Sequence, residues 1–302
     1  MKAFPLVLVI AVLLAIPQVP SVQAAAIEVR PGQSIQEAIN RAAAGDTVLV
    51  RAGVYFESLL ITKPLVLASA GPLPGPVLSG ARAEPAHVGI TVRGTSGVTI
   101  RGFIIQDYEG GGILLENVTN STVERNRLHR IGLESFAAGD REAINLRNSD
   151  NNTVIRNEAF DINHNGVFLR DGSDSNRVLN SLVRRSGQPT PPYRGCGIQI
   201  SFNSNDNEIR GNTVEETGRG IPIDRGSRRN KVIGNQAFRN QRYGVGTEEG
   251  DMPPLDNEFR QNVARDNGRA QIPAGVSGGF DLFEAPPVNN MWAPDNMGTR
   301  NF

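Results

Sequence analysis

Apolar and polar positions alternate in short bursts along the central part of the chain, and the bursts recur with a regular period. A representative burst is Ala143-Ile-Asn-Leu146, in which Ile144 and Leu146 alternate with Asn145 and Arg147. Such alternation is typical of a β-strand with one buried face. The bursts open at Gly89, Gly112, Ala143, Gly166, Gly197, Gly220 and Gly244, in steps of 23, 31, 23, 31, 23 and 24 residues.

A second apolar anchor follows each opening and usually lies in an Asn-x-Val-x-x-Asn pattern, as in Asn152-Thr-Val-Ile-Arg-Asn157. Ser121 and Ser181 are mild exceptions to this pattern. Asn tolerates turn backbone and its amide both donates and accepts hydrogen bonds. We therefore predict a ladder of stacked side chains made by Asn126, Asn157, Asn212, Asn235 and Asn262.

A period in this range predicts a solenoid, because a single unit cannot bury its own apolar face. Strands this short leave no room for helices, so the prediction is an all-β parallel β-helix with coils about 4.8 Å apart. One short amphipathic helix is expected before the first coil, beginning with a Ser34-x-x-Glu37 capping box and ended by Gly45. It would cover the open end of the core, and Trp292 would take an inward position in a degenerate last coil.

The expected organisation divides the chain into five parts. They are a signal peptide at 1–24, the cap helix and first coil at 25–70, a loop at 71–88, the β-helix repeats at 89–270 and a degenerate coil or cap at 271–302.

The repeats and the N-terminal stretches Ser34-Ile-Gln-Glu-Ala-Ile-Asn40 and Gly53-Val-Tyr-Phe-Glu57 resemble a known family. It is that of the right-handed parallel β-helix proteins of the carbohydrate-binding and sugar-hydrolase type, which includes secreted proteins related to the copper-maturation protein NosD. The resemblance implies the fold and its handedness. That fold hosts lyases, epimerases, esterases, hydrolases and adhesins, so function must be argued from a site. The signature motifs of alginate epimerases and polygalacturonases are absent from the sequence.

The N-terminus has the regions of a secretory signal peptide: Lys2, an apolar run from Phe4 to Ile16, and small residues up to Ala24. A membrane anchor is the alternative, but the run is shorter than the roughly 20 residues that a span needs. We expect a secreted or periplasmic protein without a membrane contact after cleavage. Cys196 is the only cysteine, so no intrachain disulfide forms. The 31 basic and 31 acidic residues balance, which gives no general attraction to nucleic acid.

Both long steps of the repeat carry an insertion just before an opening strand, at Leu133–Glu142 and at Gln188–Cys196. They are expected to form two walls about 10 Å apart on one side of the solenoid, with the short turn at His164 as the floor between them. Loops on a rigid scaffold commonly carry binding residues. The sequence therefore predicts a groove over the opening strands.

The outward positions of the opening strands form two columns. The first is Thr91, Leu114, Asn145, Phe168, Gln199, Pro222 and Gly246, and the second is Arg93, Glu116, Arg147, Arg170, Ser201, Asp224 and Glu248. Arg147 and Arg170 are neighbours, and like charges in a ladder need a counter-charge. Glu116, Glu142 and Asp171 could supply it as local ion pairs, or the two arginines could clamp a carboxylate or sulfate from outside.

His164 is the strongest catalytic candidate, together with Tyr193 and Arg170. Proton abstraction next to a uronate carboxylate needs a cation on the carboxylate, a base such as His and a second proton-transfer group such as Tyr. A lone turn histidine is more commonly an exposed hydrogen-bonding residue. The expected substrate contacts are Asn145, Arg147, Phe168, Arg194, Glu142 and Asp171.

No cofactor is expected. Carboxylates on adjacent strands can bind calcium, and Asp224, Glu248, Glu249 and Asp251 form such a cluster, but Arg225 and Arg228 are near enough in sequence to neutralise it. The three histidines fall in different coils, which gives no support to a transition-metal site.

Two hypotheses remain open. In the first, the protein binds an anionic polysaccharide in the groove and acts on it as a lyase or epimerase. In the second, it is a non-catalytic scaffold like the NosD relatives, whose flank contacts a periplasmic protein partner. The enzyme hypothesis predicts that His164, Tyr193 and an arginine converge on one polar cleft.

Overall fold

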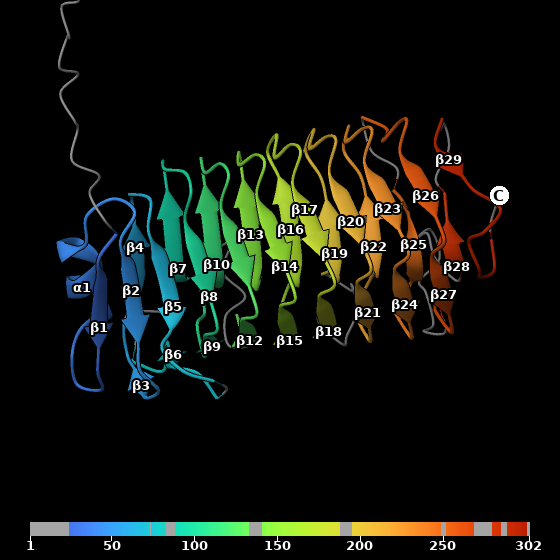
Figure 1. The fold of residues 1–302 in the computed structure, drawn as a ribbon. Helices are drawn as coiled ribbons and strands as arrows, with labels where there is room; N and C mark the ends of the chain where they lie inside the picture. Colours follow the sequence, from blue (N-terminus) through green and yellow to red (C-terminus); the bar gives the residue numbers. More distant parts are fainter. Residues whose placement is uncertain are drawn as a thin grey trace, which may run out of the picture.

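The chain winds into a right-handed parallel β-helix, whose coils stack in a single line (Figure 1). The computed structural model describes residues 24–72, 74–82, 88–132, 141–187, 195–248, 252–268, 280–284 and 289–300. In these residues the strands pair in parallel to form three sheets, which we name the anchor sheet, the opening sheet and the third sheet. The expected signal peptide at 1–24 lies outside the described residues except for Ala24.

The anchor sheet contains the Asn-x-Val-x-x-Asn anchors. It consists of β1 (Ala26–Val29), β2 (Thr47–Val50), β5 (Val66–Ser69), β8 (Thr99–Arg101), β11 (Thr122–Glu124), β14 (Thr153–Ile155), β17 (Arg177–Leu179), β20 (Glu208–Arg210), β23 (Lys231–Ile233), β26 (Glu258–Arg260) and β29 (Met291–Trp292).

The opening sheet contains the opening strands. It consists of β4 (Leu59–Ile61), β7 (Val88–Arg93), β10 (Gly111–Glu116), β13 (Ile144–Arg147), β16 (Val167–Arg170), β19 (Ile198–Ile200), β22 (Ile221–Ile223), β25 (Tyr243–Thr247) and β28 (Phe280–Phe283). The third sheet consists of β3 (Val54–Tyr55), β6 (Val77–Ser79), β9 (Ile104–Gln106), β12 (Arg127–Ile131), β15 (Glu158–Ile162), β18 (Leu182–Ser186), β21 (Thr213–Glu215), β24 (Gln236–Phe238) and β27 (Val263–Arg265).

The coils stack in register, so the same position of the repeat faces itself from coil to coil. Ile144 pairs with Val167 and Val167 with Ile198, and all three side chains are almost fully buried in one continuous apolar core. A one-residue slip would turn this apolar set outward, which is why the alternating pattern determines the register so strongly.

Polar ladders run beside the core at the turns. The predicted asparagine ladder is confirmed, and Ser181 fills the place between Asn157 and Asn212. In a typical step, Oδ1 of Asn235 accepts from the backbone N–H of Asn212 at 2.9 Å and from its Nδ2 at 3.0 Å. A second ladder connects Ser121, Asn152, Asn176, Asn207, Asn230, Asn257 and Asn290. A third connects Ser149, Ser173, Ser204 and Ser227. These bonds satisfy backbone N–H groups that the tight turns would otherwise leave unpaired.

The cap helix is α1 (Ile35–Arg41), which lies at the N-terminal end of the stack beside β1 and β2 (Figure 1). Ser34 caps it as predicted, because its side chain accepts from the backbone N–H of Glu37. The carboxylate at the helix start comes from Glu57, which accepts from the backbone N–H of Ile35 at 2.8 Å and of Gln36 at 3.0 Å. The helix ends before Gly45, at a C-cap on Ala42.

The prediction that 71–88 is a loop needs correction, because the segment contains β6 and ends where β7 begins. Pro72, Pro74 and Pro76 precede the strand instead of excluding it. At the other end Trp292 stacks on its register partner Phe259 with ring centroids 4.0 Å apart, which confirms its position against the core. Within the described part of the chain, no helix is long and apolar enough to cross a membrane.

Candidate functional site

The outward columns of the opening sheet are as the alternation predicted. Asn145 pairs with Phe168 and Arg147 with Arg170 between β13 and β16, and Phe168 pairs in turn with Gln199 of β19. A chain of contacts crosses these columns in the coils of β13 and β16, and several of the predicted site residues take part in it.

His164 and Glu142 form the first contact of this chain. The Nδ1 atom of His164 lies 2.9 Å from Oε1 of Glu142, and the side chain of Glu142 is only 4% exposed, whereas that of His164 is 41% exposed. A carboxylate can only accept, so Nδ1 carries the proton and donates, which leaves Nε2 of the neutral ring as an acceptor. A buried carboxylate thus orients a half-exposed imidazole, as in histidine-carboxylate pairs that act in proton transfer.

Asn145 extends the contact to Arg170. Its Nδ2 donates to Oε2 of Glu142 at 3.3 Å, and its Oδ1 accepts from Nε of Arg170 at 3.4 Å. Asp171 lies 3.5 Å from Nη1 of Arg170, and the guanidinium also lies over the ring of Phe168 at 5.5 Å. The structure therefore brings together Glu142, His164, Asn145, Phe168, Arg170 and Asp171.

The paired arginines have counter-charges within the chain. Arg147 forms an ion pair with Glu116, which also pairs with Arg93. These bonds lower the pKa of the Glu116 carboxyl, although its partial burial opposes the shift. Of the three acidic residues considered, Glu116 pairs with Arg147 and Asp171 with Arg170. Glu142 contacts His164. The local ion-pair interpretation is thus correct for Arg147.

Two expectations about the floor need correction. Phe168 and Asn145 point outward as predicted, but they are only 6% and 2% exposed. Phe168 is covered by Arg170, and Asn145 lies between Glu142 and Arg170, so neither offers an open surface. Tyr193, Arg194 and most of both predicted walls lie outside the described residues.

A second polar network lies farther along the same face, and sequence reasoning missed most of it. Gln199 accepts a weak bond from the thiol of Cys196 at 3.6 Å and donates to Oδ2 of Asp224 at 2.9 Å. Burial raises the pKa of the Asp224 carboxyl, and the charge of Glu248 adds to this shift. Burial also raises the pKa of the Cys196 thiol to about 12.

Glu248 is held by two arginines, Arg219 and Arg242, and not by the Arg225 and Arg228 expected from sequence nearness. Arg225 instead lies over the ring of Phe202 at 4.4 Å. One signal could have revealed the network. Glu142, Cys196 and Arg219 precede their opening strands by the same two positions, which makes them a third column of this face.

A transition metal does not fit the described residues, which hold no group of three or more His, Cys, Asp and Glu side chains able to bind an ion. His129 stacks on Phe160 at 4.8 Å and its Nδ1 contacts Arg130, while Cys196 is fully buried. For the acidic cluster considered for calcium, Glu249 and Asp251 lie outside the described residues.

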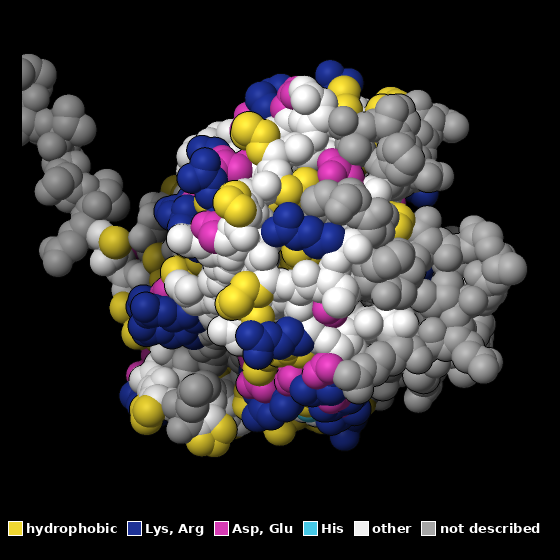
Figure 2. All heavy atoms as spheres, turned by 90° about the vertical axis from the view of Figure 1, so that its right-hand side faces the viewer, with side chains coloured by type: hydrophobic (Ala, Val, Ile, Leu, Met, Phe, Trp, Pro, Cys, Tyr) yellow, Lys and Arg dark blue, Asp and Glu magenta, His cyan; other side chains and the backbone are white. Residues whose placement is uncertain are grey.

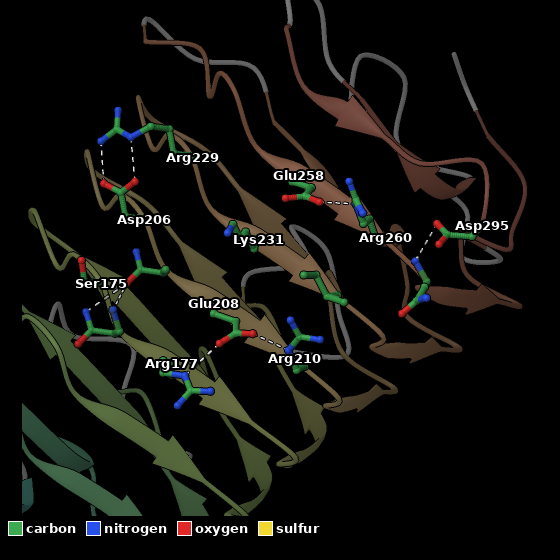
Figure 3. A pocket seen from close by; sticks show the side chains of 14 residues that line it. Ser175, Arg177, Asp206, Glu208, Arg210, Arg229, Lys231, Glu258, Arg260 and Asp295 are labelled. Atoms are coloured by element: carbon green, nitrogen blue, oxygen red, sulfur yellow. Dashed lines mark hydrogen bonds and ion pairs between the residues drawn. The ribbon is translucent and has the colours of Figure 1, made fainter.

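A depression of about 630 Å³ lies elsewhere, over the anchor sheet (Figure 3). Many of its charged side chains pair with one another: Glu208 binds Arg177 and Arg210, and Arg229 binds Asp206. Exposed pairs of this kind contribute little energy. Figure 2, which looks onto the C-terminal end, likewise shows basic and acidic side chains interspersed.

The sequence model of a family described as periplasmic copper-binding protein (NosD) matches residues 76–272. No curated protein matches the sequence.

Solved structures share the fold at low sequence identity. An alginate lyase from Paenibacillus sp. str. FPU-7 has a TM-score of 0.60 and 16% identity, over 88% of this chain and 99% of that one. A periplasmic alginate epimerase, AlgG, has a TM-score of 0.51 and 18% identity, over 85% of this chain and 66% of that one. The pectate lyase Pel9A has a TM-score of 0.53 and 14% identity, over 83% of this chain and 81% of that one. Identity this low relates the folds alone.

Proposed function

This chain belongs to the NosD family, and we propose that it binds an anionic polysaccharide of the uronate type over the opening sheet and acts on it by proton abstraction. The observation that carries the proposal is the continuous chain of contacts from His164 through Glu142 and Asn145 to Arg170. The structural neighbours named above, two of which act on alginate and one on pectate, agree with a uronate substrate.

The proposed roles follow from the geometry. Glu142 fixes the imidazole with Nδ1–H toward itself, so Nε2 of His164 is the atom that takes a proton from C5 of the sugar. Arg170 lies at the other end of the same contact chain and neutralises the charge that builds on the adjacent carboxylate as the C5–H bond breaks. Asn145 connects the two groups and keeps their separation fixed.

Two outcomes are open once the C5 proton has left. In a lyase the electron pair forms a C4=C5 double bond, the C4–O bond breaks and the leaving oxygen takes up a proton. In an epimerase C5 is protonated again from the opposite face. Tyr193 remains the proposed second proton-transfer group in either reaction.

Copper, which the family description names, plays no part in this proposal, because the described His and Cys side chains are engaged or buried. The scaffold alternative predicts that the catalytic candidates lie apart on a flat flank. The contact between His164 and Glu142 and its extension to Arg170 argue for a working site instead.

The test is incubation with alginate, polygalacturonate, hyaluronate and neutral glucans, with absorbance of the unsaturated product and binding followed in the same samples. His164→Ala should lower the turnover number about 100-fold or more. Glu142→Gln should lower turnover with little change in KM, because it acts through His164. Arg170→Lys should lower turnover and raise KM, since the ammonium group of lysine replaces a planar guanidinium that can bind a carboxylate through two nitrogens. His129→Gln is the matched control, because His129 lies on the third sheet.

Binding without unsaturated product would leave an epimerase or a binding module. Exchange of the C5 proton with solvent deuterium would identify the epimerase, and its absence would refute proton abstraction. A wild-type protein that neither binds nor changes any uronate polymer refutes the proposal and favours the scaffold.

A further inference from the structure

Three coils of the opening sheet carry buried polar groups that the proposed reaction does not use. They belong to Ser201 after β19, Arg219 and Asp224 around β22, and Tyr243 and Glu248 around β25. Ser201 and Tyr243 are completely buried and Asp224 is 5% exposed. Buried polar side chains are normally hydrogen-bonded, so a cluster of incomplete ones calls for an explanation.

The incomplete groups are donors and acceptors together. Within the described part of the chain, Nε of Arg219 and the hydroxyls of Tyr243 and Ser201 make no hydrogen bond, and neither do Oδ1 of Asp224 and Oε1 of Glu248. The hydroxyl of Ser201 lies near the Asp224 carboxyl. The hydroxyl of Tyr243 lies near the carboxylate of Glu248 without completing a bond to it. Each buried group left in this way costs about 1–3 kcal/mol. A ligand that accepts several hydrogen bonds would offset that cost.

The register places these groups on two sides of one short strip. Arg219 and Tyr243 are neighbours in the column before the opening strands, and Asp224 and Glu248 are neighbours in the column after them. Between the two columns the outward positions are Pro222 and Gly246, which carry no long side chain. The side chain of Arg219 therefore crosses the strip to reach Glu248.

The charges favour an anion. Arg219 and Arg242 both pair with Glu248, so two guanidinium groups share one carboxylate. Burial raises the pKa of the Asp224 carboxyl, and the side chain lies beside this pair. The strip is not sealed, because the side chains of Arg219, Glu248 and Arg242 are 16%, 13% and 14% exposed.

We propose that Arg219 and Tyr243 form a second anion subsite, which takes a carboxylate of the same polymer that binds at Arg170. This inference deepens the proposed function and rests on it for the identity of the ligand. The strip lies two coils beyond β16, or about 10 Å along the solenoid. The polymer would therefore run along the axis of the β-helix and present carboxylates to both positions.

The test uses the full chain and isothermal titration with galacturonate and mannuronate as monosaccharides and as trimers and hexamers. Tyr243→Phe removes a single oxygen, and Arg219→Gln removes the charge. Both should reduce the affinity for the longer oligomers about tenfold and leave the monosaccharide affinity at Arg170 unchanged, because one charge-assisted bond is lost. Tyr108→Phe is the matched control, since Tyr108 is a buried tyrosine near the N-terminal end.

A second measurement separates this inference from the proposed function. Acetate is the probe, and the melting temperature is followed against its concentration at constant ionic strength. Wild type and Tyr108→Phe should gain more stability with acetate than Tyr243→Phe, which keeps only the position at Arg170. The Tyr243→Phe variant keeps the ring stacked on Phe283, so it should fold even if Arg219→Gln does not.

If no uronate binds but acetate stabilises wild type more than Tyr243→Phe, the proposed function fails and the anion subsite stands. If Tyr243→Phe binds oligomers and responds to acetate as wild type does, the subsite is refuted and the network is only structural.

Discussion

Removing one rung of the asparagine ladder should be among the most destabilising single changes in this protein. Asn235 is fully buried in the middle of the ladder. Its Oδ1 accepts two hydrogen bonds from Asn212, and its Nδ2 donates to the carbonyl of Ile209 at 2.8 Å and to Oδ1 of Asn262 at 3.1 Å. Asn235→Ala removes all four bonds and leaves their partners in place.

The magnitude follows from the groups left behind. Two donors of Asn212 lose their acceptor and the carbonyl of Ile209 loses a donor, all in a buried turn. At about 1–3 kcal/mol for each buried group, with partial relaxation, we expect a loss of about 3–5 kcal/mol. Asn235→Ser should cost clearly less, because Ser181 already fills a rung of the same ladder by accepting from Asn157 at 3.2 Å.

The assay is urea unfolding followed by circular dichroism, with the free energy of unfolding compared at equal m-values. Gln236→Ala is the control, since Gln236 is the exposed neighbour and its replacement should change the free energy by less than about 0.5 kcal/mol. The reasoning fails if Asn235→Ala costs no more than this control, or if the alanine and serine variants are equally destabilised.

Three further outcomes are expected. Cys196, fully buried with its thiol pKa raised to about 12, should react with iodoacetamide at pH 8 only after unfolding, and alkylation of the native protein would contradict its burial. Asp224→Asn should gain stability relative to wild type as pH rises. Burial raises the pKa of Asp224 in the folded state above the unfolded value of 3.8, so wild type loses stability as pH rises from the unfolded to the folded pKa. If the difference in melting temperature between Asp224→Asn and wild type were the same at pH 3 and pH 7, the prediction would be contradicted. Glu57→Gln should lower the free energy of unfolding by about 0.5–1 kcal/mol, less in high salt, because it removes a negative charge from the start of α1. A salt-independent loss in urea titrations would point to another cause.

The fold could be predicted because each level of the pattern agrees. The alternation at Ile144 and Leu146 determines which face is buried, and the repeat places equivalent residues in register, so the asparagine ladder and the outward columns followed directly. The strand β6 was missed because three nearby prolines dominate the local signal, although Val77 and Leu78 lie beyond them.

The site was only partly predictable. The position of each residue in the repeat predicts that His164 and Arg170 lie close together. Their connection through Glu142 and Asn145 depends on side-chain conformations, which the repeat does not determine. Phe168 is buried and the Arg170 guanidinium lies over its ring, which alternation cannot show. Arg219 was missed because its partner Glu248 lies 29 residues away, in the next coil. Sequence nearness therefore suggested the wrong arginines.

The in-register stacking of nearly identical coils has a consequence for how such a protein can change. Each coil contacts chiefly its two neighbours, and the ladders repeat the same bonds at every step. A duplicated coil inserted between β16 and β22 would leave the residues on either side in their own surroundings and lengthen the distance between them by one coil. The distance between two sites along the solenoid therefore changes in steps of one coil. Duplicating or deleting about 23 residues would adapt the protein to longer or shorter ligands.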